Sequence, residues 1–369
     1  MYNWQHPDWP AFNFNFDLSA HVPSVDRYTK AVDELVARIQ QLDQDAAHDY
    51  FVERLVEEAA TTSEIEGEVM SRDDLMSSLL NNLNIGGGSD RIVRDQRARA
   101  IGQQIVLNRE TFARPLTETA LKYWHELLLG YSTSLRYVGE YRQASSPMQI
   151  ISGPEYKREV HFEAPPASRV PSEMQRFITY CNRRSDLHPI IRAGVAHLYF
   201  ESIHPFEDGN GRLGRAILEK LLSQELGTFI PFSLSHAVEA RRKDYYRALN
   251  TSSRGLDINP WLSYYFEVLL EAVSYADSLV GFTIRKQHYY RRFANQLNAG
   301  HRKAIAKLFA AGPAGFRGGM TTKKYMRINR VSQATAARAL GYLTTLGALT
   351  QHGAGRSTHY RLPETLPLP

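Results

Sequence analysis

The chain has 369 residues, of which 43% are hydrophobic, so two or three packed units with at least one sizeable core are expected. Its longest apolar runs, such as residues 190–200, are too short and too interrupted by charges to cross a bilayer. Residues 1–6 have neither the basic start nor the apolar stretch of an export signal. The single cysteine, Cys181, excludes an internal disulfide and agrees with a reducing compartment. We therefore expect a cytoplasmic protein without a membrane span.

The net charge of +5 is unevenly distributed along the chain. From Gly281 onward there are fifteen lysines and arginines but only one acidic residue, Glu364, which gives this part a net charge of +14. The first 280 residues therefore carry a net charge of −9. A basic carboxyl end on an acidic body indicates a surface for nucleic acid or for an acidic partner that is confined to that end.

The first part of the chain predicts an irregular arm followed by helices. Trp, Phe and Pro dominate the opening residues, and this aromatic arm should end near Pro23. Apolar residues at helical spacing then predict helices over 28–42 and 46–66, and Gly67 lies where the second helix should stop. The glycines at 86–88 predict a loop. Further helices are expected over 91–107, 118–129, 172–184, 190–202, 211–226, 237–252 and 260–280.

A short hairpin is expected to interrupt this helical series. Between Ser145 and Pro154, the apolar residues Met148, Ile150 and Ile151 lie among turn-forming residues, which favours two short strands over a helix. The sequence up to residue 280 therefore predicts an all-α fold with one short β-hairpin.

The carboxyl-terminal pattern is of a different kind. Helices are expected over 301–311, 321–327 and 332–346, and two extended pieces then flank a glycine-rich turn at 353–356. Helix, turn, helix and hairpin are the elements of a winged helix-turn-helix. Its second helix should present Gln333, Thr335 and Arg338 outward. The predicted parts are thus an amino-terminal arm with helices (1–96), a helical core (97–280) and a winged helix (281–369).

One segment, from His204 to Arg215, combines several residue types that suit a bound polyphosphate. It joins an apolar helix to an amphipathic one, so it lies at a helix amino terminus, where unpaired N–H groups and the helix dipole favour anions. Gly209 and Gly211 allow backbone amides to approach a phosphate, and Asn210 between them tolerates the turn and offers a side-chain donor. A triphosphate would fit there.

The charged residues of the same segment suggest chemistry on that phosphate. Arg212 and Arg215 project from the same end of the helix and can hold phosphate oxygens. Asp208 has the chemistry of an Mg²⁺ ligand, and His204, titrating near neutrality, could take a proton from an incoming hydroxyl. Phe206 should point into the core and pin the loop. Each residue alone also fits a cap or a turn, but together within twelve residues they indicate a nucleotide site.

The string from His204 to Arg212 resembles the signature of the Fic family (Fic/Doc superfamily) at every defining position. The resemblance covers roughly residues 97–276, and it implies a helical core with a β-hairpin flap. It also implies transfer of AMP from ATP to a Ser, Thr or Tyr hydroxyl of a target protein, with release of pyrophosphate. The same resemblance implies that His204 is the general base and that Asp208 binds Mg²⁺. It implies that the amides of Gly209 to Gly211, with Asn210, hold the α- and β-phosphates, that Arg212 and Arg215 hold the outer phosphates, and that Gly214 belongs to the nucleotide-binding residues. Ile150, Ile151 and Ser152 are expected to form the flap edge, which docks the target by strand addition.

The adenine contacts are left open by the sequence. The resemblance implies that Tyr245 and Tyr246 pack near the adenine or ribose, but both residues serve equally well as helix-packing aromatics. Many relatives have an Asn before a Gly further on, whereas Ser253, Arg254 and Gly255 stand there in this chain.

The segment from Thr62 to Gly67 resembles the inhibitory motif of the same family, a Ser or Thr followed by three residues, Glu and Gly. A Glu66 carboxylate beside Arg215 would form a bidentate pair and withdraw that arginine from the γ-phosphate, so ATP would be misaligned for attack. The resemblance therefore implies an autoinhibited enzyme, with dimerisation or self-modification as routes of release.

Two alternative functions remain open at this point. The same pocket could remove AMP from a modified protein, with Glu66 orienting a water molecule. Alternatively, the chain could be a nucleotide-sensing regulator that binds DNA through the winged helix, a module that also serves in protein docking or dimerisation. The intact Gly209, Asn210 and Gly211 argue against phosphate transfer.

Overall fold

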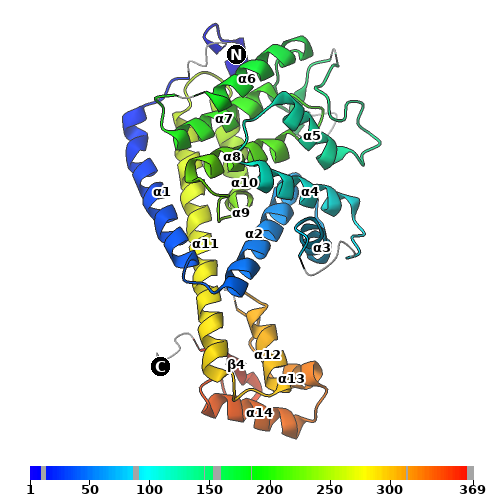
Figure 1. The fold of residues 1–369 in the computed structure, drawn as a ribbon, viewed down its shortest axis with the longest axis vertical. Helices are drawn as coiled ribbons and strands as arrows, with labels where there is room; N and C mark the ends of the chain where they lie inside the picture. The colour runs from blue at the N-terminus through cyan, green and yellow to red at the C-terminus, as the bar shows by residue number, and fades with distance from the viewer. Residues whose placement is uncertain are drawn as a thin grey trace. The chain divides into compact units, whose positions relative to one another are not determined.

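The computed structural model describes residues 1–9, 14–85, 91–144, 146–152, 159–183, 185–312 and 315–363, which are mostly α-helical (Figure 1). They form two compact units, one of residues 1–34 and 51–274 and the other of residues 35–50 and 275–369. The all-α fold class with few short strands is therefore confirmed. Among the described residues, no helix is both long enough and apolar enough to cross a membrane.

The first unit is built around α7 (Pro189–Ile203) and α8 (Asn210–Leu226), which lie side by side. Twelve residues of α7 are buried, which explains its nearly continuous apolar sequence. Other helices pack against this pair. They are α4 (Gln96–Thr111), α5 (Glu118–Leu129), α6 (Val170–Asn182), α9 (Leu234–Ala240), α10 (Arg242–Ser252) and, up to residue 274, α11 (Asn259–Phe293), whose Trp261 and Tyr265 donate to carbonyls of α7.

The amino-terminal helices differ from expectation. The first, α1 (Leu18–Ile39), begins ten residues before the predicted start and contains Pro23. It starts early because the Asp17 carboxylate accepts the N–H groups of Ser19 and Ala20, and a proline in the second turn removes only one backbone bond. The second, α2 (Gln44–Ile65), ends as predicted at Gly67, which has a φ of 82°. A third helix, α3 (Arg72–Asn82), was not predicted.

The predicted β-hairpin is present, but it is longer than residues 145–154. Strand β1 (Gln149–Ser152) pairs antiparallel with β2 (Glu159–Glu163), a strand that the sequence analysis missed. Val160 and Phe162 alternate with polar neighbours, and Phe162 packs its ring edge against Tyr2, so this strand had a detectable pattern. Gly153, which we expected within the flap, lies outside the described residues.

The second unit contains the helices and strands that the sequence predicts for the carboxyl end. These are α12 (Ala299–Phe309), α13 (Thr322–Asn329), α14 (Gln333–Thr345), β3 (Thr350–His352) and β4 (His359–Arg361). Strands β3 and β4 are antiparallel, and Met320 forms an additional bridge to Tyr360. A core of its own, including Ile305, Leu340 and Leu343, lies beneath them. The expected division of the chain at residues 96 and 280 stays a prediction.

Candidate active site

The loop between α7 and α8 has a backbone that only a few side chains tolerate. His204 closes α7 in the left-handed region, with φ 49° and ψ 61°, and Gly209 starts α8 with φ 78°. Phe206 is fully buried, as predicted, and its ring stacks on His125 with 4.2 Å between centroids. A Cβ on Gly209 would lie 2.8 Å from Leu129, so a side chain here would meet both strain and a clash. The loop is thus fixed by its own core contacts.

Two buried polar side chains clamp the same loop from inside. The Asn210 amide accepts the Phe206 N–H and donates to the Phe206 carbonyl, both at 2.9 Å. These two bonds hold the side chain in the turn, and its expected contact with a phosphate stays a prediction. Arg142, which the sequence analysis missed, donates to the carbonyl of His204 at 2.8 Å and so fixes the start of the loop. Together they leave the backbone amides at the start of α8 in a fixed orientation.

The His204 imidazole lies inside the site and is neutral at pH 7. Burial, with a smaller contribution from the nearby Arg142 guanidinium, lowers the pKa of His204 to about 4. The expectation that it titrates near neutrality is therefore wrong for this state of the protein, although its neutral form is the one that can accept a proton. Its Nδ1 lies 3.9 Å from a carboxylate oxygen of Glu201.

Glu201 is a buried carboxyl group that the sequence analysis did not single out. Burial, and then the charge of Glu66, raises the pKa of Glu201 to about 8. Its Oε1 lies only 2.4 Å from where a Cβ on Gly214 would be, so Gly214 allows α7 and α8 to approach closely. Gly214 therefore faces α7, and its expected place among the nucleotide-binding residues stays a prediction. The signal for Glu201 was a lone carboxyl group within a mostly apolar helix.

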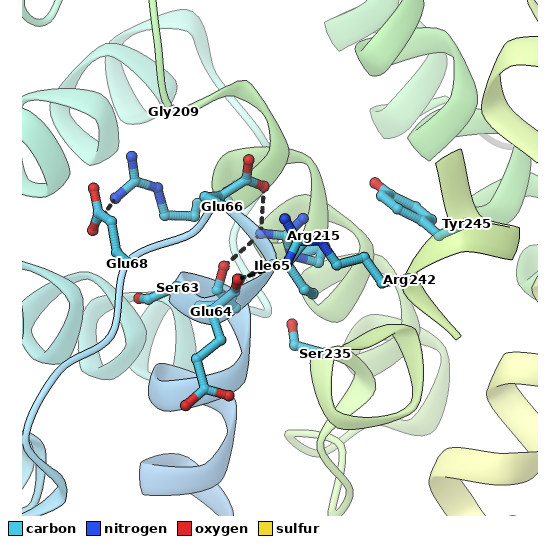
Figure 2. A network of polar contacts seen from close by, with 12 residues as sticks. Ser63, Glu64, Ile65, Glu66, Glu68, Gly209, Arg215, Ser235, Arg242 and Tyr245 are labelled. Carbon is cyan, nitrogen blue, oxygen red and sulfur yellow. Dashed lines mark hydrogen bonds and ion pairs between the residues drawn. The ribbon is translucent and has the colours of Figure 1, made fainter. Parts of the chain in front are cut away.

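Arg215 and Glu66 meet as predicted, but not in the predicted geometry (Figure 2). Arg215 is buried, and its Nη2 donates to one Glu66 carboxylate oxygen at 2.8 Å. The expected bidentate pair is wrong because Thr62 takes the other bonds: its hydroxyl accepts from Nε at 2.9 Å, and its carbonyl accepts from Nη2 at 2.8 Å. Both Thr62 and Glu66 of the inhibitory motif therefore hold this one arginine.

The Glu66 carboxylate also lies over the first turn of α8. A Cβ on Gly211 would be 2.2 Å from Glu66 Oε1 and 3.2 Å from Arg215 Nη1. Because the amino end of a helix attracts anions, the carboxylate occupies the position that suits a phosphate. Gly211 is required here for the close approach of that negative group.

Arg212 also has a carboxylate partner close to the inhibitory motif. It is buried, and its Nη1 lies 3.0 Å from Glu68, a residue that follows the inhibitory motif and that the sequence analysis missed. Its Nη2 lies 3.9 Å from Asp208. Glu66 and Glu68 thus pair with the two arginines that were expected to hold the outer phosphates, and both glutamates are labelled in Figure 2.

Asp208 is suited to a metal that arrives with a nucleotide. Its side chain is 59% exposed, and one oxygen accepts the Gly209 N–H at 2.6 Å while the other points toward Arg212. No group of three His, Cys, Asp or Glu side chains that could hold a metal occurs among the described residues. Mg²⁺ commonly binds through a single carboxylate together with phosphate oxygens and water, so the residues present fit that ion only together with a nucleotide.

The two predicted tyrosines have different surroundings. Tyr245 is buried and hydrogen bonds to His197 Nε2 at 3.0 Å, so it packs within the core, which was one of the two explanations considered. Tyr246 is 42% exposed, and its hydroxyl donates to the carbonyl of Ile65 at 3.4 Å, beside the inhibitory motif. In the hairpin, the Ile150 side chain is exposed. The side chains of Ile151 and Ser152 lie outside the described residues.

Comparisons with known proteins agree on one family. The model of the Fic/DOC family matches residues 115–222, and that of a domain of unknown function (DUF4172) matches residues 2–85. Two curated relatives, both named protein adenylyltransferase Fic, come from Drosophila mojavensis and Drosophila virilis. They are 28% and 29% identical over 182 residues, 47% of this chain. The chain spans 34% and 36% of the length of these relatives.

Solved structures support the same fold. A Fic family protein from Desulfovibrio desulfuricans has a TM-score of 0.53 at 21% identity, covering 94% of this chain and 98% of that one. A Fic domain containing signaling protein from Bacteroides thetaiotaomicron has a TM-score of 0.51 at 19% identity, covering 68% of this chain and 97% of that one. At these identities the likeness concerns the fold alone.

Proposed function

Because this chain is a Fic family protein, we propose that it transfers AMP from ATP to a Ser, Thr or Tyr hydroxyl of a target protein and that Glu66 restrains the reaction. The observation that carries this proposal is the Glu66 carboxylate, which lies over Gly211 and pairs with Arg215. A negative group held at the amino end of α8 marks the position where a phosphate group of ATP binds once that carboxylate leaves.

The proposed reaction uses the neutral imidazole and the fixed loop. His204 accepts the proton of the target hydroxyl, the hydroxyl oxygen bonds to the α-phosphorus of ATP, and the bond from that phosphorus to the bridging oxygen breaks. Pyrophosphate leaves with the negative charge, and the backbone amides of residues 209–211 stabilise the charge that develops on the α-phosphate. Bound with ATP and held by Asp208, Mg²⁺ would neutralise phosphate charge.

The pairing of Glu66 with Arg215 and of Glu68 with Arg212, which we call the brake, acts on both arginines and on the position of the phosphate. Arg215 is paired to Glu66 and Arg212 to Glu68, so carboxylates compete with the outer phosphates for both guanidinium groups. The Glu66 carboxylate also repels a phosphate at Gly211. ATP then lacks the alignment that attack in line with the leaving group requires, so transfer is slow. Strand β1, where the Ile150 side chain is exposed, is the proposed dock for an extended target segment.

Label transfer tests the proposal directly. Wild type, Glu66→Gly and the double variant Glu66→Gly/His204→Ala are incubated with Mg²⁺ and ATP labelled on either the α- or the γ-phosphate, and modified peptides are mapped by mass spectrometry. The Glu66→Gly protein should take up α-label as AMP on a hydroxyl residue, and the double variant should take up none. Glu64→Gly is the matched control, since the Glu64 side chain points away from Arg215 (Figure 2). Uptake of γ-label, or an inactive Glu66→Gly protein, would overturn the proposal.

A second arm separates writing from erasing. Glu66→Gly protein that already carries AMP is purified and mixed with unlabelled wild type. If the AMP is retained, transfer of AMP is supported as the activity of the site. If the wild type releases the AMP but Glu66→Gly does not, the site removes AMP and Glu66 is needed for that reaction. Incubating the Glu66→Gly protein with labelled ATP and a cell lysate would then identify the target. The buried free thiol of Cys181 and the use of ATP fit the cytoplasm, which we keep as the proposed location.

A further inference from the structure

The carboxyl-terminal stretch has a charge that the proposed reaction does not use. Residues 281–363 contain fifteen lysines and arginines and not one aspartate or glutamate. Among these residues, as far as the structure describes them, the exposed cations Lys323, Arg327, Arg330 and Arg338 have no acidic partner within their own stretch. Such a surface attracts a polyanion, since nothing on it neutralises the field of these cations.

The four cations lie on two consecutive helices and the turn between them. Lys323 and Arg327 belong to α13, Arg338 belongs to α14, and Arg330 forms the turn in the left-handed region, with a φ of 55°. The helices are held against one another through the buried residues Tyr325 and Leu340. The cations are therefore fixed to a rigid helix-turn-helix and not to a mobile tail.

The exposed face of α14 is narrow enough to enter a groove. Its exposed positions include Ala334, Ala337 and Gly341, which add little or no bulk, and the helix contains no acidic residue. Two long polar side chains, Gln333 and Arg338, project from this face. An amide and a guanidinium are the groups that read adenine and guanine edges in the major groove of DNA, which admits one α-helix.

The structure also limits which residues can read bases. Ser332 caps α14 by accepting the Thr335 N–H at 3.2 Å, and the two hydroxyls are 3.0 Å apart. Thr335 is exposed as predicted, but its hydroxyl is engaged at this cap. The wing formed by β3 and β4 begins beyond α14 and presents its strand residues 350–352 to solvent.

We propose that the second unit binds double-stranded DNA, with α14 in the major groove and Lys323, Arg327 and Arg330 on phosphates. Arg338 and Gln333 contact base edges. Charge complementarity selects DNA over an apolar protein partner, because the face offers cations and small residues and no large apolar patch except Tyr342, which is 46% exposed. The proposal does not depend on AMP transfer, since none of its residues belongs to the nucleotide site.

Fluorescence anisotropy with the full chain and a labelled duplex of random sequence tests the proposal. Binding should weaken between about 50 and 200 mM salt, with a slope of log K against log salt of about −3, as three contacted phosphates imply. Arg338→Glu should weaken binding by about tenfold or more, because it removes a base contact and places a negative charge in the groove. Gln333→Ala should leave the slope unchanged and alter the sequences that the protein selects from a random pool.

Arg285→Glu is the matched charge reversal, because Arg285 is exposed on α11, outside the helix-turn-helix. It should have much the smaller effect, and circular dichroism should show both variants folded. Equal weakening by the two reversals, or no binding at low salt, would overturn the proposal. If Arg338→Glu instead dissociates a dimer and DNA does not bind, the face belongs to a second copy of the chain.

Discussion

The two segments that meet at Arg215 are held in very different ways. In the loop after α7, Phe206 and Asn210 are buried, and hydrogen bonds inside the protein fix both ends of the turn. The inhibitory segment meets the arginines through Thr62 and through two carboxylates, Glu66 and Glu68, whose side chains remain 29% and 24% exposed. Moving the loop would leave buried polar groups without partners, whereas each carboxylate can exchange its arginine for water.

This contrast indicates that the loop after α7 is fixed in place and that the inhibitory segment can be released from it. A buried hydrogen-bond donor or acceptor without a partner costs about 1–3 kcal/mol, so opening the loop would cost several times that amount. Releasing one partly exposed carboxylate costs less than that total, because water takes the place of the arginine beside it. Substitutions in the loop should therefore abolish transfer, and substitutions in the inhibitory segment should release it.

The largest expected effect comes from His204→Ala, a substitution in the buried loop after α7. Removal of the group that accepts the hydroxyl proton should lower the rate of AMP transfer by the Glu66→Gly protein at least about 100-fold, as general-base catalysis predicts. Initial rates with labelled ATP measure the loss, and calorimetric titration should show that ATP still binds. Comparable rates with and without His204 would mean that another group takes the proton.

The next largest effect should come from comparing two substitutions of Glu66. Loss of the charge-assisted bond to Arg215 should raise self-modification about 10- to 100-fold, from the 1.5–3 kcal/mol typical of such a bond. Glu66→Gly removes both the charge and the group that lies over Gly211, whereas Glu66→Gln keeps the bulk. Glu66→Gly should therefore activate more than Glu66→Gln. Equal activation would show that only the charge restrains the enzyme.

Glu68→Gln should release the brake more weakly, by about 3- to 10-fold, because one charge-assisted contact to Arg212 is lost while Glu66 stays in place. The rate of self-modification and the KM for ATP are the measurements, and Glu64→Gln is the control. The effect should be additional to that of Glu66→Gln, since the two glutamates hold different arginines. If Glu68→Gln leaves both quantities unchanged, the contact with Arg212 has no part in the brake.

The sequence could predict what is contiguous along the chain. The segment from His204 to Arg215 carries its proposed base, its glycines and its arginines within one turn and one helix end, so residue types and spacing were enough to propose a site there. Most helices also followed from periodicity, but α3 was missed, and at α1 a local bond with Asp17 moved the start.

The sequence could not predict contacts between distant segments or the state of buried groups. Arg142, Glu68 and Glu201 reach the site from separate elements, and nothing in their local pattern shows which partner they meet. Asn210 could not be predicted to face the loop, since an amide serves a turn and a phosphate equally well. The low pKa of His204 likewise follows from burial, which depends on the assembled fold.

The smallest predicted effect is a pH dependence of the brake that originates at Glu201. Its pKa is raised to about 8, so the carboxyl group is neutral at pH 7 and becomes a carboxylate as the pH rises through that value. The new charge repels Glu66 and attracts Arg215, the two groups whose pairing forms the brake, while His204 and the buried Tyr245 stay neutral.

Wild-type self-modification, divided by that of Glu66→Gly at each pH, should therefore increase about threefold between about pH 7 and pH 9, because only the wild type has a brake to weaken. Dividing by the unrestrained variant removes the pH dependence of the chemical step itself. Glu201→Gln is the matched control, since its amide cannot ionise and should give a ratio independent of pH. A ratio that rises equally in Glu201→Gln would assign the effect to another group, and a falling ratio would mean that ionised Glu201 strengthens the hold on Arg215.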